Sequence, residues 1–118
     1  MANLRLIAMK CNEQEDWTGD DDIYIDINSQ RVWSARFDKE QSRTINKDFS
    51  FVSRAEIRVY EHDTDSPDDY LGSTVVTLNA DMINKEIKVN YSNMGASYDL
   101  WFMVYAPLPA SFVNNLIG

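Results

Sequence analysis

The sequence contains little cysteine, glycine or proline and no long apolar run. Its one cysteine, Cys11, cannot form an internal disulfide, and four glycines and three prolines in 118 residues are too few for disorder, linkers or collagen-like repeats. No stretch approaches the roughly 20 apolar residues of a membrane-spanning helix, and the start, MANLRLIAMKCNEQEDW, reaches charged residues before a signal-peptide core could form. We therefore expect a single domain, held together by an apolar core or by bound ions, that is cytoplasmic or lies peripherally on a membrane.

Lysine and arginine are absent from two segments that hold most of the acidic residues. Residues 13–26 contain seven acids, residues 61–69 contain five, and these 23 positions together have a net charge of −12. The other 95 residues hold seven acids and eleven bases, which sum to +4. Nucleic acids are usually bound through a broad basic face, so a molecule with this charge distribution is not expected to bind them.

Eight short stretches of alternating, β-branched or aromatic residues are separated by turn residues, which predicts antiparallel strands in a β-sandwich or barrel. They cover residues 4–9, 23–27, 31–33, 48–52, 55–60, 73–78, 86–91 and 98–105. Tight turns are expected at 28–30 and 93–96, and a helical turn at 80–85. Six aromatic residues are assigned to the core or to a sheet face: Trp33, Phe37, Phe49, Phe51, Trp101 and Phe102.

The predicted strands divide the chain into a domain, residues 1–105, and a tail, residues 106–118. In the tail Phe112 and Leu116 lie one helical turn apart, with Val113 and Ile117 beside them. This spacing predicts a short helix that docks on the domain.

Acidic residues crowded into two connections between strands are either solvated turn residues or the two halves of one ion site. Crowded carboxylates repel one another unless a multivalent cation neutralises them, and calcium accepts about six to eight oxygen ligands in irregular loops. An EF-hand does not fit, because Asp68 stands where a loop starting at Asp63 needs glycine and Thr74 stands where it needs glutamate. Zinc does not fit either, since one cysteine and one histidine cannot supply its usual ligands.

With strands before and after each acidic segment, the chain resembles a C2 domain. Residues 16–24, DWTGDDDIY, are similar to the family pattern D-x-x-G-x-S-D-P-Y. Residues 61–72, EHDTDSPDDYLG, are similar to D-x-D-x5-D-x-x-G, and residues 46–51, NKDFSF, to N-E-x-F-x-F. The resemblance covers about residues 4–105 and implies an all-β fold, an eight-stranded antiparallel β-sandwich in the circularly shifted strand order that the family calls type II.

The resemblance further implies that calcium is bound by five acidic residues: Asp16, Asp22, Glu61, Asp63 and Asp69. Glu61 stands where the family has aspartate, and its longer side chain would approach an ion from a different angle. Four further aspartates of the two segments, Asp20, Asp21, Asp65 and Asp68, are assigned to solvated turns. The tip of the second segment lacks the aromatic or basic residues of membrane-inserting members, so any insertion into a bilayer should be shallow.

Five basic residues are spread over the third predicted strand, the following loop and the fourth strand: Arg31, Arg36, Lys39, Arg43 and Lys47. They are either ordinary surface charge or, as in some C2 domains, a strip that binds anions such as lipid phosphates. The single histidine and the single cysteine have no nucleophile–base context, so we do not expect an enzyme.

The sequence therefore predicts a calcium-binding C2-like module that uses bound Ca²⁺ to engage an anionic partner such as phospholipid headgroups. The alternative is a calcium-stabilised structural module, without membrane binding, whose partner is a protein or a glycan. The bare loop tip and the remaining negative charge favour the alternative, whereas the basic strip favours the lipid partner.

Overall fold

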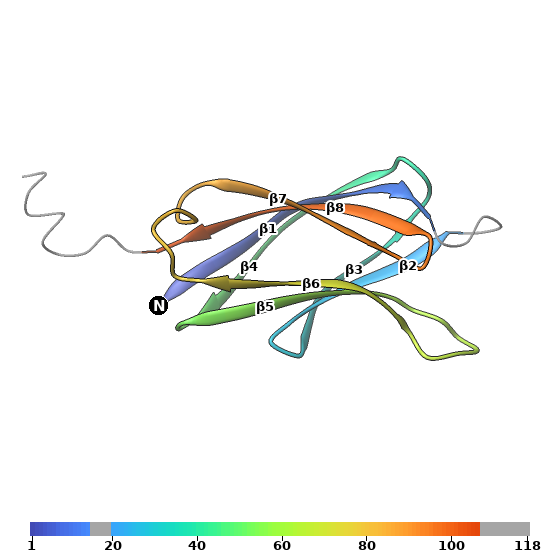
Figure 1. Ribbon diagram of the computed structural model, residues 1–118, viewed down its shortest axis with the longest axis horizontal. Coiled ribbons are helices and arrows are strands. Elements are labelled where there is room, and N and C mark those ends of the chain that lie inside the picture. Colours follow the sequence, from blue (N-terminus) through green and yellow to red (C-terminus); the bar gives the residue numbers. More distant parts are fainter. Residues whose placement is uncertain (15–19, 107–118) are drawn as a thin grey trace, which may run out of the picture.

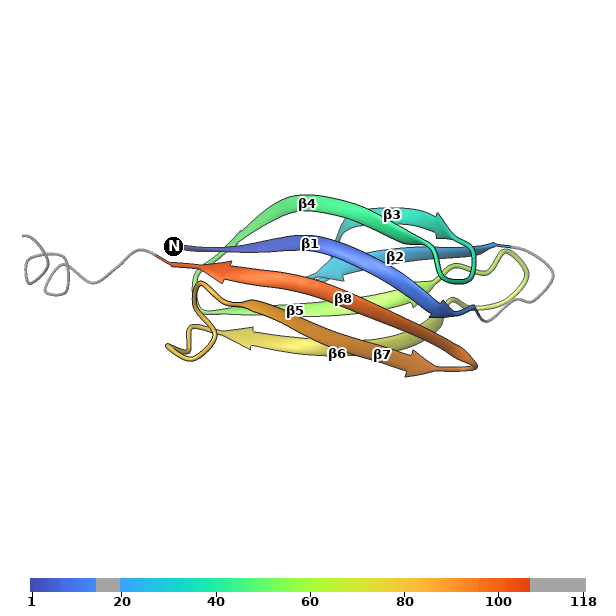
Figure 2. The ribbon, with the colours of Figure 1, turned by 90° about the horizontal axis from the view of Figure 1, so that it is seen from above.

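The computed structural model describes residues 1–14 and 20–106, which form two four-stranded antiparallel sheets packed face to face (Figure 1, Figure 2). The strands are β1 (Ala2–Glu13), β2 (Asp21–Ile27), β3 (Gln30–Phe37), β4 (Ser42–Phe51), β5 (Arg54–Glu61), β6 (Asp69–Thr77), β7 (Glu86–Asn93) and β8 (Ala96–Tyr105). One sheet has the order β4-β1-β8-β7 and the other β3-β2-β5-β6. The predicted all-β, eight-stranded sandwich is confirmed.

The first and last strands of the domain are neighbours in the middle of one sheet. β1 pairs with β8 on one side and with β4 on the other, and it leads directly into the first acidic segment (Figure 2). A bulge between Leu6 and Ala8 shifts the inward face of β1 by one residue, so that Leu4 and Leu6 are buried before it and Met9 and Cys11 after it. This long strand therefore contributes to the core along its whole length.

Apolar side chains from both inner faces form one core, in agreement with the predicted alternation. Phe37, Phe51 and Phe102 are buried in it, and Trp33 and Phe49 pack against it. Trp101 is half-buried on a sheet face, where the Lys88 ammonium lies 5.5 Å from the centroid of its ring.

A two-residue turn sets the register of β2 against β3. Asn28 and Ser29 have φ values of 50° and 67°, the left-handed conformation of a type I′ hairpin, and Ile27 pairs with Gln30. The tight turn predicted here is confirmed. With this turn and one register shift along the hairpin, Asp22 lies opposite Arg36.

The connection between β6 and β7 differs from the helical turn expected at 80–85. The Met82 amide donates to the Asn79 carbonyl, which closes a single turn, and Ile83 then forms an isolated bridge with Val104 of β8. A single turn is therefore present, but it closes between Asn79 and Met82 and ends before Ile83, so it does not extend over 80–85. The helix predicted in the tail falls at 112–117, outside the described residues. Within the described part of the chain, no helix is long and apolar enough to cross a membrane.

Candidate functional site

Three carboxylates meet where β5 ends and β6 begins. Glu61 is the last residue of β5 and pairs with Asp69, the first residue of β6, while Asp63 lies in the connection between them. One carboxylate oxygen of each lies within 4.8 Å of the others. Glu61 is only 2% exposed, and Asp63 and Asp69 are half-buried. We call these three residues the carboxylate cluster. Its oxygen donors and their close spacing fit a calcium ion, which is bound by carboxylate oxygens in irregular loops.

The backbone of Asp22 is hydrogen-bonded beside the carboxylate cluster, but its side chain forms an ion pair with Arg36. Its carbonyl accepts a hydrogen bond of 2.7 Å from the His62 amide, and its Oδ1 lies 3.0 Å from Arg36 Nε. The fifth predicted ligand, Asp16, lies outside the described residues. The structure thus brings three of the five predicted ligands into one cluster and places a fourth beside it.

Asp68 supports the loop that carries the cluster. Its Oδ2 accepts a hydrogen bond from the Tyr24 hydroxyl, and its Oδ1 lies 3.1 Å from the Asp63 amide nitrogen and 3.0 Å from His62 Nδ1. The hydrogen bond from Tyr24 lowers the pKa of Asp68, and the contacts with Asp63 and His62 act in the same direction. Burial and the contact with Asp68 raise the pKa of Tyr24 to about 12. Asp68, which the sequence assigned to a solvated turn, is therefore a structural residue of the loop.

We expect Asp68→Asn to make stability less dependent on pH. Because folding lowers the pKa of Asp68, its stabilising effect is present above the ordinary aspartate pKa of about 4 and is lost as pH falls through the lower folded value. At pH 6 the variant should be about 1 kcal/mol less stable than the unaltered chain, and at pH 3 the difference should shrink. Chemical unfolding in chelator at both pH values measures this. Asp65→Asn, which removes the same charge at the exposed tip, is the control, and an equal pH dependence in both variants would contradict the assignment.

A buried polar contact joins the two sheets close to the acidic segments. Asp21 and Tyr98 are both 0% exposed, and the Tyr98 hydroxyl donates a 2.5 Å hydrogen bond to Asp21 Oδ2. Cys11 pairs with Tyr98 across the β1–β8 ladder, and burial raises the pKa of its thiol. The assignment of Asp21 to a solvated turn was wrong. Asp21 is in phase with Ile23 in β2, and this alternation was the signal that could have placed it on the inner face.

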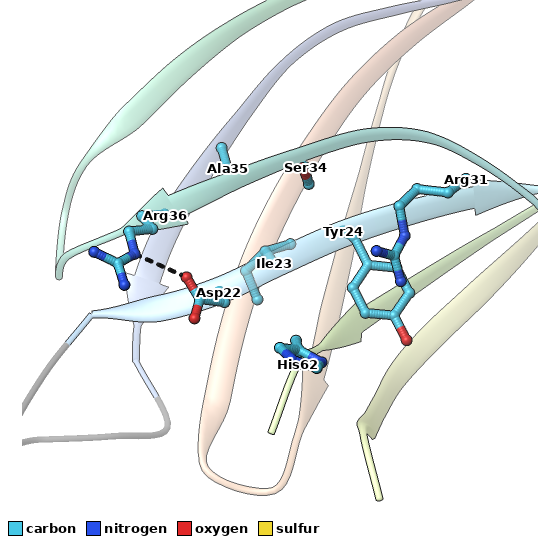
Figure 3. Close-up of a pocket in the computed structure, with 8 residues that line it drawn as sticks. All are labelled: Asp22, Ile23, Tyr24, Arg31, Ser34, Ala35, Arg36 and His62. Carbon is cyan, nitrogen blue, oxygen red and sulfur yellow. Dashed lines mark hydrogen bonds and ion pairs between the residues drawn. The ribbon is translucent and has the colours of Figure 1, made fainter. Parts of the chain in front are cut away.

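An open pocket of about 270 Å³ lies on the outer side of β2 and β3, beside His62, the first residue after β5 (Figure 3). Asp22, Tyr24, Arg31, Ser34, Arg36 and His62 line it, with Ile23 and Ala35. The Arg31 guanidinium lies 3.7 Å from the centroid of the Tyr24 ring, a cation–π contact that holds it at the pocket wall. Two arginines, a hydroxyl and an imidazole are groups that can donate hydrogen bonds to an anion.

The structure separates the five basic residues of the predicted strip. Arg31 and Arg36 line the pocket, whereas Lys39 lies 3.4 Å from a carboxylate oxygen of Glu13. The Arg43 guanidinium donates from Nε and Nη2 to the backbone carbonyl of Arg36, at 3.1 and 3.0 Å. Lys47 lies on β4, in the other sheet. Two of the five residues therefore line one pocket.

No protein-family model and no curated protein matches the chain. Several solved structures are similar to the chain. The C2A domain of plant extended synaptotagmin 1 matches with a TM-score of 0.53 and 12% identity, over 92% of this chain and 95% of that one. The C2A and C2B domains of extended synaptotagmin 2 match with a TM-score of 0.57 and 18% identity, over 88% of this chain and 39% of that one.

Human GIVD cytosolic phospholipase A2, in complex with a fluorophosphonate inhibitor and terbium chloride, matches with a TM-score of 0.50 and 13% identity. The match covers 90% of this chain and only 17% of the phospholipase, so the chain corresponds to a small part of that enzyme. The three likenesses agree on the architecture. The chain has a C2-like fold, as the resemblance in its acidic segments predicted.

Proposed function

We propose that the chain is a calcium-binding module that uses the bound ion to engage an anionic partner such as phospholipid headgroups. The observation that carries this proposal is the carboxylate cluster at one end of a C2-like sandwich. Three carboxylates this close repel one another, and a divalent cation relieves the repulsion while taking their oxygens as ligands. Asp22 and Asp16 are the further ligands in this proposal.

A bound calcium ion supplies positive charge and open coordination positions for phosphate or carboxylate oxygens. The two acidic segments have a net charge of −12, so without a cation this end of the molecule repels an anionic surface. Arg31 and Arg36 add two hydrogen-bonding cations in the adjacent pocket. In this proposal the module is not an enzyme, and it works in the cytoplasm or at a membrane surface.

A specific observation favours a second candidate, a calcium-stabilised module that binds a protein or a glycan. The exposed tip between the strands consists of Thr64, Asp65, Ser66 and Pro67, none of which is basic or aromatic. Three of the basic residues already have partners: Lys39 and Arg36 form ion pairs, and Arg43 donates to a backbone carbonyl. A flat lipid surface would then meet few free cations, while a carboxylate of a protein or a glycan could still complete the coordination of the ion.

Calcium binding is tested by calorimetric titration of the chelator-treated protein. We expect calcium to bind, and magnesium to bind more weakly because its small octahedral shell suits flexible carboxylates poorly. Terbium, the ion present with the similar human phospholipase, should compete with calcium and gain luminescence from the tyrosines near the cluster. The absence of a calcium signal by both methods would refute the proposal.

Co-sedimentation with vesicles that contain phosphatidylserine separates the lipid partner from the alternatives. Calcium should recruit the protein, raised salt should weaken binding, and Arg31→Gln with Arg36→Gln should weaken it by about 2 kcal/mol, or roughly thirtyfold. Arg54→Gln with Arg58→Gln removes the same charge from β5, where both residues pair with Glu56, and should have a small effect. If calcium binds but no vesicle recruits the protein, the second candidate is the better one.

A further inference from the structure

The ion pair between Arg36 and Asp22 joins a proposed calcium ligand to the proposed anion pocket. Arg36 Nε donates to Asp22 Oδ1 at 3.0 Å, and both side chains line the same pocket (Figure 3). The Asp22 side chain is 44% exposed and the Arg36 side chain 73% exposed, so neither is fixed by packing. The backbone at Arg36 is held by the two hydrogen bonds from Arg43. Each side chain can therefore move while its strand stays in place.

The backbone of Asp22 is fixed beside the carboxylate cluster. Its carbonyl accepts a 2.7 Å hydrogen bond from the amide of His62, the residue between Glu61 and Asp63 of the cluster. A carboxylate on a fixed backbone has a few staggered positions about the Cα–Cβ bond. One of them is occupied in the structure, where the carboxylate meets Arg36. Because the side chain is 44% exposed, packing does not hold it in that position.

We propose that Arg36 and a bound cation compete for the Asp22 carboxylate, so that calcium binding frees Arg36 for an anion in the pocket. This inference rests on the proposed calcium site and concerns its regulation. Without the cation, the ion pair keeps Asp22 from the cluster and occupies the Arg36 Nε–H that would otherwise be available to an anion in the pocket. With the cation, Asp22 becomes a ligand, and Arg36 joins Arg31 in presenting planar donor groups, which suit a phosphate group. Coupling of this kind is reciprocal: phosphate in the pocket raises calcium affinity by the same factor.

Arg31 provides the fixed half of the phosphate site. It is stacked on Tyr24 at 3.7 Å and forms no ion pair with any residue that the structure describes. Its guanidinium is therefore present in the pocket with or without the cation. The change in phosphate affinity depends on Arg36 alone, which makes the coupling measurable with single substitutions.

The first test follows the Arg36 Nε–H signal by NMR of protein with ¹⁵N-labelled arginine. The Arg36→Lys variant lacks this signal and identifies it. On calcium addition, the backbone signals of Glu61, Asp63 and Asp69 should shift, and the Arg36 Nε–H should shift and exchange faster with water as its hydrogen bond to Asp22 breaks. Shifted backbone signals with an unchanged Arg36 signal would overturn the competition but leave the calcium site standing. Unchanged backbone signals would refute the calcium site itself.

The second test measures inorganic phosphate binding in chelator. Asp22→Asn should bind phosphate up to about fivefold more tightly than the unaltered chain, because an exposed ion pair of this kind no longer holds Arg36. Asp20→Asn, which removes the same charge two residues away, should change the affinity less than twofold. Equal effects of the two variants would overturn the proposal. Vesicles with a phosphoinositide distinguish the source: recruitment of Asp22→Asn without calcium points to a lipid headgroup, and a gain for inorganic phosphate alone points to free phosphate.

Discussion

Replacing Asp63 and Asp69 together by asparagine should abolish calcium binding without destabilising the cation-free protein. The substitutions keep side-chain size but remove two charges from a cluster whose oxygens lie within 4.8 Å of one another. Fewer like charges mean less repulsion in the folded state, so stability in chelator should equal or exceed that of the unaltered chain. At a hundredfold excess over the dissociation constant, calcium should stabilise the unaltered protein by about 2.7 kcal/mol and the double variant by almost nothing.

Thermal unfolding with calcium and with chelator measures both effects. In a domain of this size about 2.7 kcal/mol corresponds to a rise in melting temperature of roughly 10 °C. Asp81→Asn with Glu86→Gln is the matched control, since these acids lie near the connection between β6 and β7 at the opposite end of the sandwich (Figure 1). If the double variant unfolds in chelator, Asp63 and Asp69 hold the loop by hydrogen bonds, and the solvated-turn interpretation of this segment is the better one.

The sequence predicted the carboxylate cluster because its geometry follows from one hairpin. Glu61 and Asp69 lie in the connection between two predicted strands, 55–60 and 73–78. In the structure β5 extends to Glu61 and β6 begins at Asp69, so the antiparallel pair brings the two residues together. Asp63 follows β5 by two residues and stays close. The fold was predictable for a similar reason, since alternation and turn residues are local signals that strands and hairpins share.

The ion pair between Arg36 and Asp22 was not predictable, because it depends on the exact register of β2 against β3. A register shift between Ile25 and Asp26 changes which residues face each other beyond it, and the sequence contains no mark for that shift. The basic strip was misleading for a related reason. Arg43 and Lys47 are close in sequence to Arg36 but lie on β4, a strand of the other sheet. Closeness in sequence does not determine which sheet a residue joins.

Removing the Tyr98 hydroxyl should be among the most damaging single-atom changes in this domain. Tyr98→Phe takes away a donor 2.5 Å from Asp21 Oδ2, and both residues are 0% exposed. Burial and the neighbouring carboxylate raise the pKa of Tyr98 far above its ordinary value, so the hydroxyl keeps its proton and donates to Asp21. Loss of a hydrogen bond to a buried carboxylate should cost about 3 kcal/mol, since water cannot replace the donor in the core.

Tyr91→Phe is the matched control for this prediction. Tyr91 is 3% exposed, but its hydroxyl lies 2.7 Å from Thr74 Oγ1, a neutral group, so its loss should cost only about 1 kcal/mol. Urea unfolding in chelator measures both values as shifts of the midpoint at constant slope. Adding Asp21→Asn to each variant completes a double-mutant cycle, in which Asp21 should couple strongly to Tyr98 and negligibly to Tyr91. Equal costs for the two tyrosines would mean that Asp21 depends on other donors, and that the Tyr98 hydroxyl does not hold the two sheets together beneath the acidic segments.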